Sequence, residues 1–225
     1  MRPIDKGASP YVSIRHYSEA QPYLKDRIGL YCSYCGFEIS HVPEIEHVAA
    51  KSKGGSETAW NNLLLGCKYC NTRKGTTVTP ANVNDYLWPD QYNTAIAFPC
   101  INEIPVIDKA KLDLIDPSGT AYQKAERLFN VVGLGNRPKT KLEDLRFWKR
   151  SEVYQCAVRA AKRWKSNPTE ELKESTVELA KAMGFFSIWM SVFDDVPEML
   201  LAFLDAFPGT KRTYYDADGH PLPIL

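Results

Sequence analysis

The sequence lacks any apolar run long enough to cross a bilayer. Its longest strongly apolar stretch, Phe185 to Phe193, stops at Asp194, whereas a spanning helix needs about 20 apolar residues. Met1 to Ala20 also lacks a basic segment leading into an apolar one, because this stretch is polar and interrupted by proline and glycine. We therefore expect a cytoplasmic protein without a membrane partner.

The chain also lacks a net charge that would mark it as a binder of polyanions, because 28 Lys and Arg oppose 27 Asp and Glu. This balance hides segregation along the chain. Between Arg137 and Lys165 there are ten basic and three acidic residues, and from Pro168 to Leu225 there are four basic and ten acidic ones. The basic segment is either a track for a phosphate backbone or a set of solvated helix faces.

Cysteine is scarce outside one stretch of the chain. Four of the six cysteines form two Cys-x-x-Cys pairs, namely Cys32, Cys35, Cys67 and Cys70. This spacing is typical of a tetrahedral zinc site, since two intervening residues let a tight turn wrap the ion. Four thiolates leave no open position, so we expect the Zn²⁺ to be structural. Cys100 and Cys156 lie outside this set, and we expect buried free thiols in a reducing compartment.

A second set of polar residues lies within the loop that the zinc would close: Glu46, His47, Asn62 and Asn71. Gly54-Gly55 follows the histidine, and Asn62 precedes Cys67 by five positions. This arrangement resembles the HNH nuclease family. The resemblance implies an α+β fold with a small zinc-stabilised ββα-metal core, followed here by a mainly α-helical C-terminal region.

The chemistry of phosphodiester hydrolysis gives each of these residues a role. Near neutral pH the reaction needs a cation on the phosphate and a base on the attacking water. By the resemblance, Glu46 and Asn71 bind catalytic Mg²⁺ or Mn²⁺, His47 is the general base, and Asn62 orients it. Nearby cationic side chains are candidates for nucleic-acid binding: Lys51, Lys53, Arg73 and Lys74.

Departures from the usual family pattern leave the preferred metal open. Glu46 stands where Asp is commoner, Ala50 where proline is frequent, and Asn71 in place of a histidine. Geometry adds a condition, because neighbours in a regular strand point to opposite faces. Glu46 and His47 can face one site only if the strand ends or bends beside them.

The pattern of apolar residues predicts the elements around this core. It favours a helix over 19–28, a β-hairpin that pairs 36–40 with 44–48, and a helix near or within 61–74. Further helices are expected over 121–131, 142–164, 169–183 and 196–207. We interpret 1–80 as the nuclease core with its N-terminal arm and helix, 81–118 as a Pro-rich ordered connection, 119–208 as a helical region and 209–225 as an exposed tail.

A wider and weaker resemblance extends beyond the core. Tyr17-Ser18-Glu19, Leu134-Gly135-Asn136, Leu142 and Arg146 are placed as in PtuB-type HNH effectors of Septu and retron antiphage systems. It implies a restraining ATPase of the PtuA type and, in retron-linked members, a reverse transcriptase with its RNA–DNA product.

Two questions stay open at the level of sequence. The C-terminal apolar residues form either an interface for such a partner or this chain's own core: Phe185, Phe186, Trp189, Met190 and Phe193. The polar set belongs either to a metal-dependent endonuclease or to a non-catalytic zinc-stabilised module that binds nucleic acid or protein. No base-reading element is recognisable, so DNA and RNA are both possible substrates.

Overall fold

In the computed structural model, which describes residues 1–138, 140 and 143–225, the chain has a mixed α+β fold, as expected. The elements of the first half are η1 (Tyr17–Ala20), α1 (Gln21–Ile28), β1 (Glu44–His47), η2 (Lys51–Lys53), η3 (Trp60–Asn62), β2 (Leu63–Gly66), α2 (Lys68–Lys74), η4 (Val83–Asp85) and α3 (Thr94–Ala97). Those of the second half are β3 (Cys100–Ile101), β4 (Ile104–Pro105), α4 (Lys109–Ile115), α5 (Thr120–Val131), α6 (Leu145–Ser166), α7 (Glu170–Met183), α8 (Phe186–Val192), α9 (Pro197–Ala206) and η5 (Arg212–Tyr214).

The strand that carries Glu46 and His47 pairs with a different segment from the one predicted. β1 pairs antiparallel with β2, in a register that sets Glu46 opposite Leu64 and His47 opposite Leu63. The predicted hairpin with 36–40 is wrong, since Glu38 and Phe37 form only single bridges, to Tyr31 and Gly184. The predicted helix near 61–74 is correct only from Lys68 onward.

The strand β2 was predicted as part of a helix because it is fully buried. Its three leucines are all completely buried, so the strand shows no alternation of polar and apolar residues. A short apolar run of this kind cannot be told from a buried helical turn by periodicity. The run Leu63-Leu64-Leu65 therefore carried no signal that distinguished the two.

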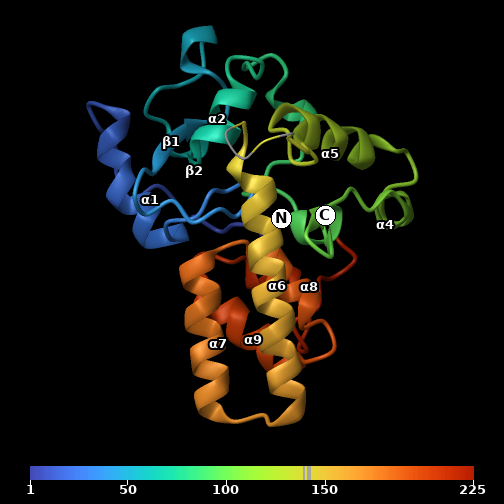
Figure 1. Ribbon diagram of the computed structural model, residues 1–225. Helices are drawn as coiled ribbons and strands as arrows, with labels where there is room; N and C mark the ends of the chain where they lie inside the picture. Colours follow the sequence, from blue (N-terminus) through green and yellow to red (C-terminus); the bar gives the residue numbers. More distant parts are fainter. Residues whose placement is uncertain (139, 141–142) are drawn as a thin grey trace.

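The helices of the second half follow the predicted pattern closely. α5, α6, α7 and α9 occupy the four segments expected to be helical, although Leu142, the predicted start of one of them, lies outside the described residues. Figure 1 shows α6 running from beside α2 into the layer formed with α7, α8 and α9. The short helix α8 was not predicted, because its sequence has no side-chain cap at its N-terminus.

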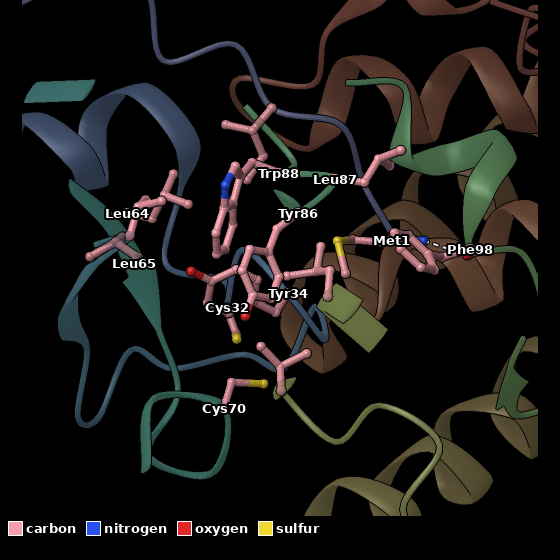
Figure 2. Close-up of a cluster of buried hydrophobic side chains, with 14 of the residues drawn as sticks. Met1, Cys32, Tyr34, Leu64, Leu65, Cys70, Tyr86, Leu87, Trp88 and Phe98 are labelled. Carbon is pink, nitrogen blue, oxygen red and sulfur yellow. Dashed lines mark hydrogen bonds between the residues drawn. The ribbon is translucent and has the colours of Figure 1, made fainter. Parts of the chain in front are cut away.

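Two clusters of buried residues stabilise the molecule. The first includes Tyr34, Trp88 and Phe98 together with the three leucines of β2. Figure 2 shows Tyr86 and Trp88 beside Tyr34, with the sulfur atoms of Cys32 and Cys70 at one edge.

The second cluster fills the layer of α6 to α9. Four of the aromatic residues considered as a partner interface lie within it, at most 3% exposed: Phe185, Phe186, Trp189 and Phe193. Met190 packs against it, so this set closes the chain's own core.

The segment 209–225 is not the exposed tail that we predicted. Tyr214 and Tyr215 are buried, Thr210 bridges to Ile4, and the Asn93 amide donates to the Leu222 carbonyl at 3.0 Å. The segment packs against the rest of the chain because its aromatic side chains bury apolar surface. The prediction of an exposed tail rested on its glycine and proline residues, which do not show this burial. The division at residues 80, 118 and 208 stays a prediction.

Among the described residues, no helix has both the length and the apolar character needed to cross a membrane.

Candidate metal centre and adjoining polar site

The four paired cysteines meet in one cluster. Their Sγ atoms all lie within 4.8 Å of one another, and Cys35 Sγ is 3.7 Å from Cys67 Sγ. In a tetrahedral site with Zn–S bonds of about 2.3 Å, sulfur atoms are about 3.8 Å apart. The cluster therefore fits zinc. With four sulfur ligands, the ion would have no position for a substrate and would be structural.

Each cysteine pair is shaped by a local turn. In the first turn, the Gly36 N–H donates to the Cys32 carbonyl at 2.9 Å, and Gly36 has a φ of +77° that favours glycine. In the second, the Cys70 N–H points to Cys67 Sγ at 3.5 Å, so that Cys67 caps α2. Asn71 follows Cys70 directly, and the metal cluster thereby fixes its place on α2.

Helix α6 adds a buried arginine to the cluster. Arg146 Nη1 donates to Cys70 Sγ at 3.0 Å and to the Val132 carbonyl at 2.8 Å, and its Nη2 pairs with Asp144 at 2.7 Å. Four thiolates around Zn²⁺ carry a net charge of about −2, which this cation partly balances. Arg150, one turn further along α6, is also buried and donates to the Leu134 carbonyl at 3.2 Å.

These two arginines do not belong to the predicted track for a phosphate backbone. Arg146 and Arg150 are 1% and 4% exposed, so neither can contact a phosphate backbone. Their spacing of four places them on one face of α6, but the sequence could not show that this face turns inward. Lys139 and Lys141 lie outside the described residues, whereas Arg159, Lys162 and Arg163 are exposed near the end of α6.

The two faces of β1 carry different chemistry. Glu44 and Glu46 point toward α2, where Glu44 Oε2 accepts from the Asn71 amide at 2.8 Å and Glu46 pairs with Lys74 at 2.9 Å. His47 contacts the ring of Tyr17 and the loop that follows β1. The strand ends at His47, but Glu46 and His47 share none of these side-chain partners. Strand alternation therefore separates their immediate surroundings.

Glu46 and Asn71 flank one point on β2. A Cβ atom placed on Gly66 would lie 3.2 Å from Glu46 Cβ and 3.8 Å from Asn71 Cβ. The missing side chain at Gly66 thus lets a carboxylate and an amide converge there. With Glu44 on the same face, the donor set consists of hard oxygen atoms and fits Mg²⁺ or Mn²⁺.

Glu46 itself is almost fully enclosed. Its side chain is 1% exposed, and Oε1 accepts from the Tyr34 hydroxyl at 3.2 Å as well as pairing with Lys74. Both contacts involve Oε1, so Oε2 is the oxygen of this carboxylate that could bind an ion. Burial lowers the pKa of Lys74 to about 8, and at neutral pH most of its ammonium groups remain charged. The ammonium also donates to the His47 carbonyl at 2.8 Å.

His47 is held through one ring nitrogen. Its Nε2 lies 3.0 Å from the Glu57 carbonyl oxygen. Because a carbonyl oxygen can only accept, this contact places the proton on Nε2 and leaves the lone pair on Nδ1. Burial lowers the pKa of His47, the hydrogen bond to Glu57 opposes the change, and the charge of Lys51 adds to it. The neutral form with a free Nδ1 is therefore favoured.

Asn62 acts on the loop and not on the imidazole directly. Its Oδ1 accepts from the Ala49 N–H at 2.7 Å, and its Nδ2 donates to the Ala49 and Ser56 carbonyls at 3.0 and 2.6 Å. These bonds tie the two ends of the glycine loop together. Glu57, whose carbonyl holds His47, directly follows Ser56.

Three of the four expected nucleic-acid contacts lie on the surface. Lys51, Lys53 and Arg73 are exposed, but Lys74 is buried. The prediction that Lys74 contacts the substrate is wrong in this structure, because its ammonium is used within the protein. No sequence pattern distinguishes the two residues, since Arg73 and Lys74 are adjacent basic residues of a short helix and only the fold determines which of them faces inward.

No curated protein and no solved structure matches this chain. A family model described as HNH endonuclease matches residues 32–77, about a fifth of the chain, and this segment contains both cysteine pairs, β1, β2 and α2. The match and the geometry together support the assignment of this segment to the HNH family.

Proposed function

We propose that this protein is a metal-dependent endonuclease that hydrolyses phosphodiester bonds of nucleic acids. The observation that carries the proposal is the surroundings of His47. Its imidazole keeps Nδ1 unprotonated beside the end of β1, while the other face of the same strand presents Glu46 and, across Gly66, Asn71. A proton acceptor and a hard oxygen donor thus belong to adjacent residues of the segment that matches the HNH model, on opposite faces at the point where β1 ends.

In this proposal each residue has one task. His47 Nδ1 accepts a proton from the attacking water. Asn62 fixes the glycine loop and, through Glu57, keeps the imidazole in the required tautomer. Glu46 Oε2 and the Asn71 amide oxygen would hold a divalent ion, which when bound neutralises charge on the phosphate. Lys51, Lys53 and Arg73 offer exposed cations to the strand.

The direct test is cleavage of plasmid DNA, single-stranded DNA and total tRNA with Mg²⁺ and then Mn²⁺. The wild type should cut at least one substrate, and His47→Ala should be slower by about 10²–10⁴-fold, the usual contribution of a general base. His41→Ala is the matched control, because His41 is exposed and lies outside the site.

The same experiment distinguishes the nuclease from the competing function of a binding module. A wild type that binds but cuts none of the three substrates, with either metal and with any copurifying partner present, would contradict the nuclease and favour a non-catalytic zinc-stabilised binding module. Cleavage by His47→Ala at the wild-type rate would instead contradict the role of this imidazole while leaving the activity standing.

We further propose that the nuclease is the toxic effector of an antiphage system, restrained by an ATPase partner and, in a retron, linked to a reverse transcriptase. The wider sequence resemblance is the support for this role. If its substrate choice is loose, such a nuclease would harm its host, and we therefore expect a partner to restrain it. Purification from a host that carries the neighbouring genes should yield a complex. A monodisperse lone chain under those conditions would contradict the effector role.

A further inference from the structure

We infer that Tyr17, which precedes the segment matched by the HNH model, is a positioning residue for His47. The inference rests on the proposed nuclease function, and its structural basis is a direct contact between the two side chains. The ring centroids of Tyr17 and His47 are 4.9 Å apart, and the planes meet at 71° in an edge-to-face arrangement. Such pairs stabilise one relative orientation of the rings.

The contact completes a set of restraints on the imidazole. The Glu57 carbonyl restrains His47 through Nε2, but this one hydrogen bond still permits torsion of the ring about its Cβ–Cγ bond. A second contact on the ring removes this freedom. Tyr17 supplies it, and Nδ1 remains the nitrogen available to a substrate water.

Tyr17 is itself held by a rigid turn. The Glu19 carboxylate accepts from the His16 N–H at 2.9 Å, and the Ser18 N–H donates to His16 Nδ1 at 3.3 Å, which caps η1. Helix α1 follows at once and is anchored in the first core by Leu24 and Ile28, both completely buried. The arm that carries Tyr17 is therefore fixed relative to β1.

Charged side chains join this turn to the glycine loop. Lys51 Nζ lies 4.3 Å from the centre of the Tyr17 ring and 3.3 Å from Glu57 Oε1. The His16 ring packs against the Tyr17 ring in a tilted arrangement with the centroids 4.3 Å apart, and its Nε2 lies 3.8 Å from the same Glu57 oxygen. Tyr17 and Glu57 are thus the two points at which the N-terminal turn and the loop meet around His47.

The test combines kinetics with a spectroscopic measurement on the imidazole. In ¹H–¹³C spectra of protein with labelled histidine, the ring protons of His47 should shift in Tyr17→Leu, which keeps apolar bulk but loses the aromatic ring. On the substrate that the wild type cuts, kcat of Tyr17→Leu should fall about 10- to 100-fold with KM little changed, as for a misplaced catalytic group. Tyr17→Phe restores the ring and should rescue both readouts.

Tyr23→Leu is the matched control, because Tyr23 is a partly exposed tyrosine of α1 that packs on Tyr11. It should change neither the His47 resonances nor kcat. A rise in KM alone for Tyr17→Leu would overturn the inference, since the ring would then serve substrate binding. Unshifted His47 resonances would overturn it whether or not the protein proves to be a nuclease, and shifted resonances with no cleavage by the wild type would instead locate the failure in the proposed function.

Discussion

At the scale of single residues, two glutamates on one face of β1 differ in what they do. Glu44 keeps part of its side chain exposed and accepts from Asn71, whereas Glu46 is enclosed with Lys74 and Tyr34. The ion pair of Glu46 and Lys74 lies at 1% exposure on both sides. Removing one partner of such a pair leaves a buried charge without compensation. The two glutamates should therefore respond differently to the same substitution.

We predict that Glu46→Gln lowers the free energy of unfolding by about 3–5 kcal/mol, the usual cost of breaking a buried ion pair. Glu44→Gln should change it by less than about 1 kcal/mol, as for a partly exposed pair. Urea denaturation followed by far-UV circular dichroism measures both. Glu46→Gln combined with Lys74→Met removes both charges and should recover part of the loss. Equal destabilisation by the two single variants would contradict the enclosed pair.

The metal cluster and the buried cations beside it show what could and could not be predicted from the sequence at this scale. The identity and spacing of Cys32, Cys35, Cys67 and Cys70 were enough to predict the metal cluster, because ligand type and spacing determine zinc binding. The burial of Lys74 and Arg146 was not predictable. Both are long cationic side chains that usually stay solvated, and only the packing of α2 and α6 turns them inward.

At the scale of elements, α6 joins the metal cluster to the helical layer. Its first turn carries Arg146, which donates to Cys70 Sγ. Val153 and Ala157 in its middle belong to the second core, and the helix packs against α8. The length and position of this helix were predicted from its apolar spacing. Its contact with the cysteines was not, because the contact joins residues 76 positions apart and no local pattern records such a separation.

We predict that Arg146→Met releases zinc about 10- to 100-fold more readily, the usual effect of losing a hydrogen bond to a metal ligand. The reason is that the thiolate of Cys70 would lose its cationic donor. Competition with a coloured zinc chelator measures the release. Arg159→Met is the matched control on the same helix, since the exposed Arg159 contacts Cys156 and no paired cysteine. Equal release by both variants would contradict the role of Arg146.

At the scale of the whole molecule, the two ends of the chain link the two cores. Arg2 donates through Nη2 to the Ile28 carbonyl at 2.7 Å and through Nη1 to Thr210 Oγ1 at 3.2 Å. Its guanidinium lies 5.9 Å from the centre of the Phe207 ring, and Tyr215 is buried in the second core. The last segment is thus part of the structure that positions α1, and α1 in turn follows the turn that carries Tyr17.

We predict that Tyr215→Ala lowers the free energy of unfolding by about 3–5 kcal/mol, as for other buried aromatic residues, and that both cores unfold earlier. Zinc release reports on the first core and far-UV circular dichroism on the helical layer. Both midpoints should move to lower temperature together, because Arg2 ties Ile28 to residues 208–210. Tyr215→Phe keeps the ring and should leave both nearly unchanged. If the dichroism midpoint moved while zinc release did not, the cores would unfold independently, and the C-terminal segment would stabilise only the helical layer.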